Sequence, residues 1–234
     1  MSLHTVTITG ADDAVNPRDL FALSRAFPFV EWAVLRSTER RGTNRYPSDV
    51  WLHALATAAF RTSGDARFAA HLCGDLCNEV MAGDPRAIQD YYGLFRRYQL
   101  NGWSRFKLSG LRVAKLHPEL EFIAQATSIE AFEGTMSFVK RFGLTNVKPL
   151  FDPSGGRGLP IDLDHLPPTY AYSTGYAGGI TPDNVRNVVQ HLTGYGLQFW
   201  IDMESKVRTN DKLDLDKVHR VLEACAPFVE AKNQ

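Results

Sequence analysis

The residues with the clearest chemical use in this sequence are glycines and polar side chains in its second half. Gly178 and Gly179 precede Pro182, where a helix is expected to begin, and Ser205 and Lys206 follow an apolar run. A phosphate needs several backbone N–H donors that converge on a small volume, and glycine lets the backbone approach closely. These two segments therefore predict a phosphate-binding site.

A third glycine segment supports the same prediction. Gly156 and Gly158 follow an apolar run that ends in an aspartate, and the segment could close over a ligand. Any one of these glycines could instead only make a tight strand-to-helix turn. As a set they favour phosphate binding. Lys206 could strengthen the site with its charge or crowd the phosphate with its Cβ.

Eight β-rich runs alternate with helical stretches along the chain, and Gly, Pro, Asp or Asn bound them. This pattern predicts an α/β fold, a single (β/α)8 TIM barrel of eight parallel strands in one domain over residues 1–234. No GxGxxG follows the first run to mark a dinucleotide site. Met81–Tyr92 is interpreted as an enlarged connection before the fourth strand. The predicted strands are His4–Thr9, Phe29–Arg36, Ala66–Leu72, Arg96–Leu100, Leu120–Ala126, Asn146–Phe151, Thr169–Ala177 and Leu197–Asp202.

Helices are predicted where apolar residues recur every three or four positions. Three of them are Pro47–Arg61, Ile129–Phe142 and Pro182–Leu192. Thr181 before a proline and Ser128 before Ile-Glu-Ala are typical N-cap residues. In such a barrel, functional residues gather at the carboxyl ends of the strands, and phosphate commonly binds at the loops after the seventh and eighth strands. That is where the predicted phosphate segments fall.

Motifs at the predicted strand ends carry a family resemblance. They are Ile8-Thr9-Gly10, Arg45-Tyr46-Pro47-Ser48, Gln99-Leu100-Asn101-Gly102, Leu150-Phe151-Asp152 with Gly155-Gly156-Arg157-Gly158, Ala177-Gly178-Gly179-Ile180 with Pro182 and Asn184-Val185, and Ser205-Lys206-Val207. In order and spacing this succession resembles phosphoribosylanthranilate isomerase, a barrel that rearranges an aminated ribose phosphate. The resemblance extends over nearly the whole chain and implies the barrel fold. Function is a separate question.

The resemblance implies a general acid at Asp152, which would need a pKa raised by burial. It also places Thr9 where the family has a cysteine as general base. A threonine hydroxyl cannot accept and hold a further proton near neutral pH, so the general base must be another residue. The alternative for Asp152 is a helix cap or a loop hydrogen bond. Other residues that could supply a base, or serve only in packing, are Asp12, Asp13, His71 and Cys73.

Four further residues are assigned to substrate binding. Arg36 ends the second strand and Arg45 follows it, and the family uses an arginine here for a substrate carboxylate, which suits a bidentate guanidinium. A solvated basic loop is the alternative interpretation. Asn101 stands where the family has a histidine, which indicates a pocket adapted to another ligand. Asp202 ends the eighth strand.

Composition excludes several classes of protein. Lys+Arg and Asp+Glu are equal at 26 each, so no long-range field favours nucleic acid or an anionic membrane. No segment is long and apolar enough for a membrane span, and the N-terminus lacks a signal-peptide pattern. The three cysteines fit reduced thiols, and no zinc-ligand spacing occurs. We expect a cytoplasmic protein with no metal and no cofactor, whose partner is a small phosphorylated metabolite.

Three functions remain open from the sequence. The first is an enzyme of isomerase or lyase type that uses Asp152 as acid and an altered base on a phosphorylated substrate. The second is a non-catalytic barrel that binds a phosphorylated metabolite as a sensor or partner protein. The third is a functional phosphoribosylanthranilate isomerase with a substituted base.

Overall fold

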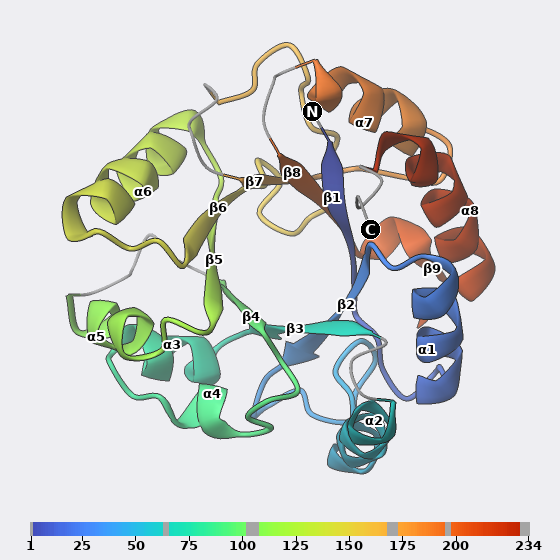
Figure 1. Ribbon diagram of the computed structural model, residues 1–234, viewed down its shortest axis with the longest axis horizontal. Helices are drawn as coiled ribbons and strands as arrows, with labels where there is room; N and C mark the ends of the chain where they lie inside the picture. The colour runs from blue at the N-terminus through green and yellow to red at the C-terminus, as the bar shows by residue number, and fades with distance from the viewer. Residues whose placement is uncertain (1, 63–65, 102–107, 168–172, 195–197, 230–234) are drawn as a thin grey trace.

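Eight parallel strands form a closed barrel in which each strand pairs with the next and β8 pairs with β1 (Figure 1). The computed structural model describes residues 2–62, 66–101, 108–167, 173–194 and 198–229. The strands are β1 (Leu3–Thr9), β2 (Val30–Arg36), β3 (Arg67–Leu72), β4 (Arg97–Leu100), β5 (Glu121–Ala126), β6 (Val147–Phe151), β7 (Thr174–Ala177) and β8 (Phe199–Met203). The predicted (β/α)8 fold is confirmed.

Helices surround the barrel (Figure 1). They are α1 (Pro17–Ala26), α2 (Asp49–Arg61), α3 (Asp75–Met81), α4 (Arg86–Gln89), α5 (Leu108–Leu116), α6 (Ile129–Phe142), α7 (Val185–Thr193) and α8 (Leu215–Cys225). The 3-10 turns η2 (Ser205–Val207) and η3 (Ala226–Phe228) and a hairpin of β9 (Arg208–Thr209) and β10 (Lys212–Leu213) complete the elements. Among the described residues, no helix is long and apolar enough to cross a membrane.

Most element ends lie close to the predicted ones. Helix α6 begins where predicted because Ser128 accepts a hydrogen bond from the Ala131 N–H. It also ends where predicted, before Gly143, whose backbone is left-handed. The predicted connection Met81–Tyr92 contains the short helix α4. Strand β7 begins at Thr174, and residues 168–172 of the predicted seventh strand lie outside the described part of the chain, as does residue 197 of the eighth.

The predicted start of helix α7 is wrong by three residues. Thr181 and Pro182 begin a turn, in which the Thr181 hydroxyl accepts hydrogen bonds from the N–H groups of Asp183 and Asn184. The helix begins only at Val185, after Asn184. A threonine side chain can close either a turn or a helix cap, so the Thr-Pro signal alone did not distinguish them.

Alternate residues of each strand face the inside of the barrel. A small apolar cluster of Ile123, Leu150 and Trp200 fills the middle of it. Burying side chains such as Ile123 and Leu150 stabilises the fold by roughly 1.5–3 kcal/mol each. At the amino ends of the strands, Arg97 pairs with the carboxylates of Glu31 and Glu121 and lies over the Trp200 ring. At the carboxyl ends, polar side chains surround a pocket.

Candidate active site

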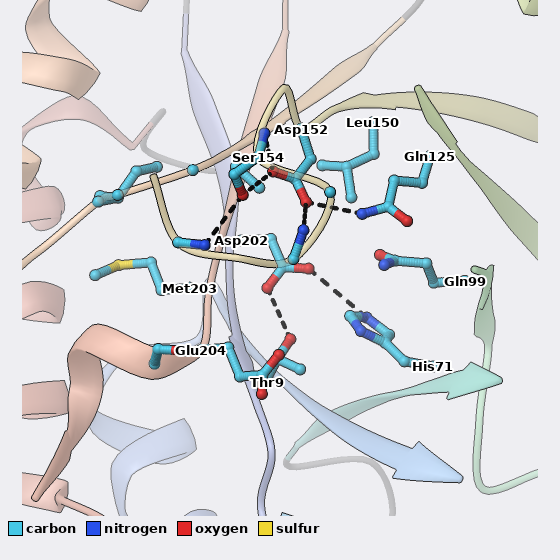
Figure 2. A pocket seen from close by; sticks show the side chains of 18 of the residues that line it. Thr9, His71, Gln99, Gln125, Leu150, Asp152, Ser154, Asp202, Met203 and Glu204 are labelled. Atoms are coloured by element: carbon cyan, nitrogen blue, oxygen red, sulfur yellow. Dashed lines mark hydrogen bonds and ion pairs between the residues drawn. The ribbon is translucent and has the colours of Figure 1, made fainter. Parts of the chain in front are cut away.

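A cavity of about 180 Å³ opens at the carboxyl ends of the strands. Figure 2 shows polar side chains from β1, β3, β4, β5 and β8, and from the end of β6, pointing into it. Polar groups from separate strands that meet in one cavity are what a small-molecule site requires. The predicted site residues that line it are Thr9, Asn101, Asp152, Gly156, Gly158, Gly178, Gly179, Asp202, Ser205 and Lys206.

Asp202, on β8, lines the pocket and lies next to side chains from β1 and β3. The Thr9 hydroxyl on β1 donates a hydrogen bond of 2.7 Å to Asp202 Oδ1. On the other side, His71 Nε2 on β3 lies 3.7 Å from Asp202 Oδ2 (Figure 2). Burial raises the pKa of Asp202 to about 8, and the nearby carboxylates of Glu204, Asp152 and Glu31 add to the rise, while the Thr9 hydrogen bond opposes it. This carboxyl group therefore holds a proton near neutral pH.

His71 is buried in the same pocket, with 2% of its surface exposed. Burial lowers its pKa to about 3, and the positive charge of Arg97 adds to that effect. The imidazole is therefore neutral at neutral pH. Its Nε2 atom has no hydrogen-bond partner among the described residues.

Asp152 is held by its own loop. The N–H and the hydroxyl of Ser154 both donate to Oδ1, at 3.1 and 2.7 Å. The Gly156 N–H and the Gln125 amide donate to Oδ2, each at 2.7 Å. Both carboxylate oxygens thus act as hydrogen-bond acceptors. Before Asp152 could give a proton to a substrate, these donors would have to move.

The glycine segments lie against one another at the pocket. The Gly158 N–H donates to the Ser154 hydroxyl. A Cβ on Gly179 would lie 2.5 Å from Pro160 Cα, and one on Gly178 would lie 2.9 Å from the Leu159 carbonyl oxygen. Both glycines also have positive φ. Their lack of a side chain is thus required by the chain that packs on them, whether or not phosphate binds.

The predicted arginines do not line this cavity. Arg36 is the neighbour of Leu35, which does, and alternation turns Arg36 toward the helices. There it donates to the Ala87 carbonyl at 2.8 Å and to the Asp90 carboxylate at 3.1 Å. The structure therefore corrects the prediction for Arg36: it joins β2 to the region of helix α4 instead of pointing into the mouth.

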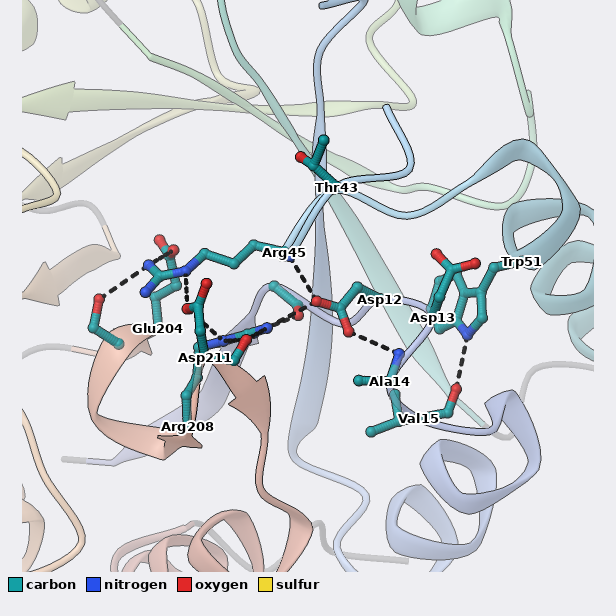
Figure 3. A network of polar contacts seen from close by, with 12 residues as sticks. Asp12, Asp13, Ala14, Val15, Thr43, Arg45, Trp51, Glu204, Arg208 and Asp211 are labelled. Atoms are coloured by element: carbon teal, nitrogen blue, oxygen red, sulfur yellow. Dashed lines mark hydrogen bonds and ion pairs between the residues drawn. The ribbon is translucent and has the colours of Figure 1, made fainter. Parts of the chain in front are cut away.

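Arg45 lies in a hollow that adjoins the pocket and shares Asn101, Gly156 and Glu204 with it. Its guanidinium donates to Glu204 and to Asp211, each at 2.7 Å (Figure 3). Two carboxylates thus already occupy the group predicted to bind a substrate carboxylate.

Three of the four possible bases have other partners. Asp12 pairs with Arg208, and Asp13 accepts hydrogen bonds from Ser48. The Asn101 amide donates to Cys73 Sγ at 3.1 Å, and burial raises the pKa of that thiol. Of these four residues, His71 lines the pocket.

Comparison with known proteins agrees with this architecture. Residues 111–224 match the family model described as N-(5'phosphoribosyl)anthranilate (PRA) isomerase. The structure superposes on N-(5'-phosphoribosyl)anthranilate isomerase from Pyrococcus furiosus with a TM-score of 0.60 and 14% identity, over 95% of this chain and 98% of that one. The chain thus resembles this isomerase in its barrel fold, and in sequence over residues 111–224.

The sequence relatives of this isomerase-like barrel match only part of it. The N-(5'-phosphoribosyl)anthranilate isomerase of Streptococcus pneumoniae is 38% identical over 76 residues, which are 32% of this chain and 36% of the relative. The chain thus spans about a third of the length of that relative. A second solved structure, 3-hexulose-6-phosphate synthase from Salmonella typhimurium, has a TM-score of 0.55 at 11% identity, over 97% of this chain and 100% of that one. At these identities the solved structures show the fold alone.

Some pocket residues of the isomerase-like barrel were not found from the sequence. Gln99 and Gln125 point into the pocket from β4 and β5, and Ser154 and Glu204 line it from loops. Alternation along β4 is a signal that could have found Gln99, because it lies two residues from the predicted site residue Asn101. The predicted fifth strand held no site residue from which to count, so Gln125 had no such signal. No comparable period exists in loops.

Proposed function

We propose that this chain catalyses proton transfer, of isomerase or lyase type, on a small phosphorylated metabolite, with Asp152 and Asp202 as its two carboxyl groups. One observation carries the proposal: the carboxyl groups of Asp202 on β8 and Asp152 just after β6 line one polar pocket, and burial raises the pKa of Asp202 to about 8. Groups with shifted pKa values in a cleft are typical of catalytic sites.

The support for a phosphorylated substrate is the convergence of the glycine segments. Gly156 and Gly158 after β6, Gly179 after β7, and Ser205 and Lys206 after β8 all line the cavity that holds the carboxyl groups. Barrels commonly bind phosphate at the loops after the seventh and eighth strands. The exposed ammonium group of Lys206 adds positive charge there. We infer that these loops hold the phosphate while the carboxyl groups face the carbon chain.

Proton transfer needs one group that gives a proton to oxygen and one that takes a proton from carbon. We assign the donor role to Asp202, because it holds a proton near neutral pH. Asp152, whose oxygens accept hydrogen bonds, is then the acceptor once the loop opens. The Thr9 hydroxyl cannot act as a base, and Thr9 contributes through the hydrogen bond that it donates to Asp202. The opposite assignment, with Asp152 as acid, follows from the family resemblance.

Anthranilate is a poor fit to this mouth. The guanidinium of Arg45, which the resemblance assigns to the substrate carboxylate, is paired with Glu204 and Asp211. We therefore expect a substrate without an aromatic carboxylate, and little phosphoribosylanthranilate isomerase activity.

The test uses hydrogen–deuterium exchange at carbon, because it detects proton transfer without knowledge of the product. The protein is incubated in D2O with phosphorylated aldoses and ketoses, ribose 5-phosphate among them, and NMR follows exchange next to the carbonyl. We expect exchange with one of them and a loss of roughly 10²–10⁴-fold in both Asp202→Asn and Asp152→Asn. The rate should fall as pH rises through about 8, where Asp202 loses its proton.

Other results would change the proposal. A rate that rises through this pH would make Asp202 the base and leave Asp152 as the acid. Tight binding of ribose 5-phosphate with no exchange would identify a non-catalytic binding protein. Rapid turnover of phosphoribosylanthranilate would identify a functional isomerase with a substituted base.

A further inference from the structure

His71 presents an unusual atom to the pocket. Its Nε2 is buried and has no hydrogen-bond partner among the described residues, although it can donate or accept. Buried polar nitrogens are seldom left unpaired. The acidic group near it is Asp202, whose Oδ2 lies 3.7 Å away (Figure 2). A small movement of either side chain would bring the two atoms into hydrogen-bond contact.

The hydrogen bond from Thr9 determines which oxygen of Asp202 carries the proton. Asp202 Oδ1 accepts the Thr9 hydroxyl at 2.7 Å. The proton of a carboxylic acid then belongs on Oδ2, which is the oxygen nearest His71 Nε2. The shifted pKa values agree with this arrangement, because a carboxyl with a pKa of about 8 and an imidazole with a pKa of about 3 are both uncharged at neutral pH.

Charged groups on other strands and in the neighbouring loops favour the same uncharged pair. The carboxylates of Glu31 on β2, Asp152 after β6 and Glu204 after β8 all disfavour a negative charge on Asp202. The guanidinium of Arg97 on β4 disfavours an imidazolium at His71.

We propose that His71 is a positioning residue whose unprotonated Nε2 accepts a hydrogen bond from the carboxyl proton on Asp202 Oδ2. This rests on the proposed role of Asp202 as proton donor. His71 fixes the proton on the oxygen that faces the pocket until a substrate oxygen takes it. The proton then passes from Oδ2 to the substrate, Asp202 becomes a carboxylate that still accepts from Thr9, and His71 stays neutral.

The chain offers a matched control on the neighbouring strand. Gln99 on β4 lines the same pocket and also has a buried carbonyl oxygen without a hydrogen-bond partner among the described residues. If that oxygen were the acceptor instead, Gln99→Met would abolish the response of the His71 Nε2 signal to the ionisation of Asp202. The proposal requires this response to persist in Gln99→Met.

The experiment is nitrogen NMR of the full chain labelled with 15N-histidine, recorded from about pH 6 to about pH 9.5. The His71 signals are assigned by their loss in His71→Phe. At the lower pH we expect a neutral imidazole with its proton on Nδ1. The Nε2 signal should then move with a midpoint near the Asp202 pKa of about 8, and this movement should be absent in Asp202→Asn and retained in Gln99→Met.

An imidazolium, or a proton on Nε2, at the lower pH would overturn the proposal, as would a movement that survives in Asp202→Asn. The measurement needs no turnover. A failed search for a substrate would therefore count against the proposed function and leave this result intact.

Discussion

At the scale of single residues, the site differs at Thr9 from the one that the family resemblance implies. Thr9 stands where the resemblance implies a thiol base, and its hydroxyl donates to Asp202. In the proposed mechanism Asp202, which is buried beside neutral His71, gives the proton, and Asp152 takes the place of the missing base. A carboxyl group in a low-dielectric pocket favours its protonated form, and this makes Asp202 suited to the proposed role of proton donor.

The same burial predicts how stability depends on pH. The folded-state pKa of Asp202 lies above its ordinary value, so the folded chain binds the proton more tightly than the unfolded chain. Its contribution to stability is therefore complete below about pH 4 and is lost as pH rises to about 8. Asp202→Asn keeps the shape and carries no charge. We expect it to match the wild type near pH 4 and to exceed it near pH 8.5 by on the order of 5 kcal/mol in free energy of unfolding.

Urea denaturation at the two pH values measures the difference. His71, whose pKa is lowered, acts in the opposite direction between about pH 3 and 6.5, but it is present in both proteins and cancels. Thr9→Val is the control, since it removes the hydroxyl and keeps the titrating carboxyl, and its stability should still fall with pH. Equal stability of Asp202→Asn and wild type at both pH values would show that Asp202 ionises normally.

Sequence reasoning identified about half of the residues that line the pocket, but not how they pair. Asp152, Asp202 and the glycines follow from their places at strand ends. Arg36 was misplaced because neighbouring residues of a strand point to opposite sides, so Leu35 faces the pocket and Arg36 faces the helices. The contact between His71 and Asp202 joins β3 to β8 across the barrel, and no local pattern encodes it.

At the scale of elements, ion pairs and hydrogen bonds connect the loops after β1, β2 and β8. Arg208 on β9 pairs with Asp12 at 2.8 Å and donates to the Gly10 carbonyl at 2.7 Å. Asp12 also accepts from the Arg45 N–H, and Asp211 in the hairpin turn pairs with the Arg45 side chain (Figure 3). This network fixes one wall of the pocket mouth.

Removing Arg208 should therefore be costly. Its side chain is 2% exposed and that of Asp12 is 6% exposed, so Arg208→Met leaves a buried carboxylate without its partner. We expect a loss of roughly 3–5 kcal/mol in free energy of unfolding. Arg41→Met is the matched control, because the Arg41–Asp49 pair has both side chains 49% exposed and should cost less than about 1 kcal/mol. Similar costs for both variants, measured by denaturation, would show that the Arg208 network does not hold the loops.

Helix starts show what local sequence can and cannot predict. The N-cap of α6 was predictable because Ser128 caps the first turn of the helix directly. The start of α7 was not, because the Thr181 hydroxyl closes a turn before the helix, and Gly179 and Asn184 are tied to that turn by a hydrogen bond. Both outcomes use the same residue types, and the packing of the preceding loop selects between them.

At the scale of the whole molecule, the barrel divides into two halves. The segment that matches the family model, residues 111–224, holds Asp152, the glycine loops and Asp202. Thr9, His71 and Asn101 lie outside it. Both carboxyl groups and the proposed phosphate-binding loops therefore lie in the half that resembles the family. Thr9 on β1 and His71 on β3, which lie next to Asp202, come from the other half.

The raised pKa of Asp202 is a property of the closed barrel, because strands from both halves bury the carboxyl and place other carboxylates near it. The most direct test is carboxyl 13C NMR of the full chain labelled at aspartate, with the Asp202 signal assigned by its loss in Asp202→Asn. We predict a single titration of that signal with a midpoint near 8. A midpoint near the ordinary aspartate value of about 4 would contradict the account, because Asp202 would then hold no proton to transfer at neutral pH.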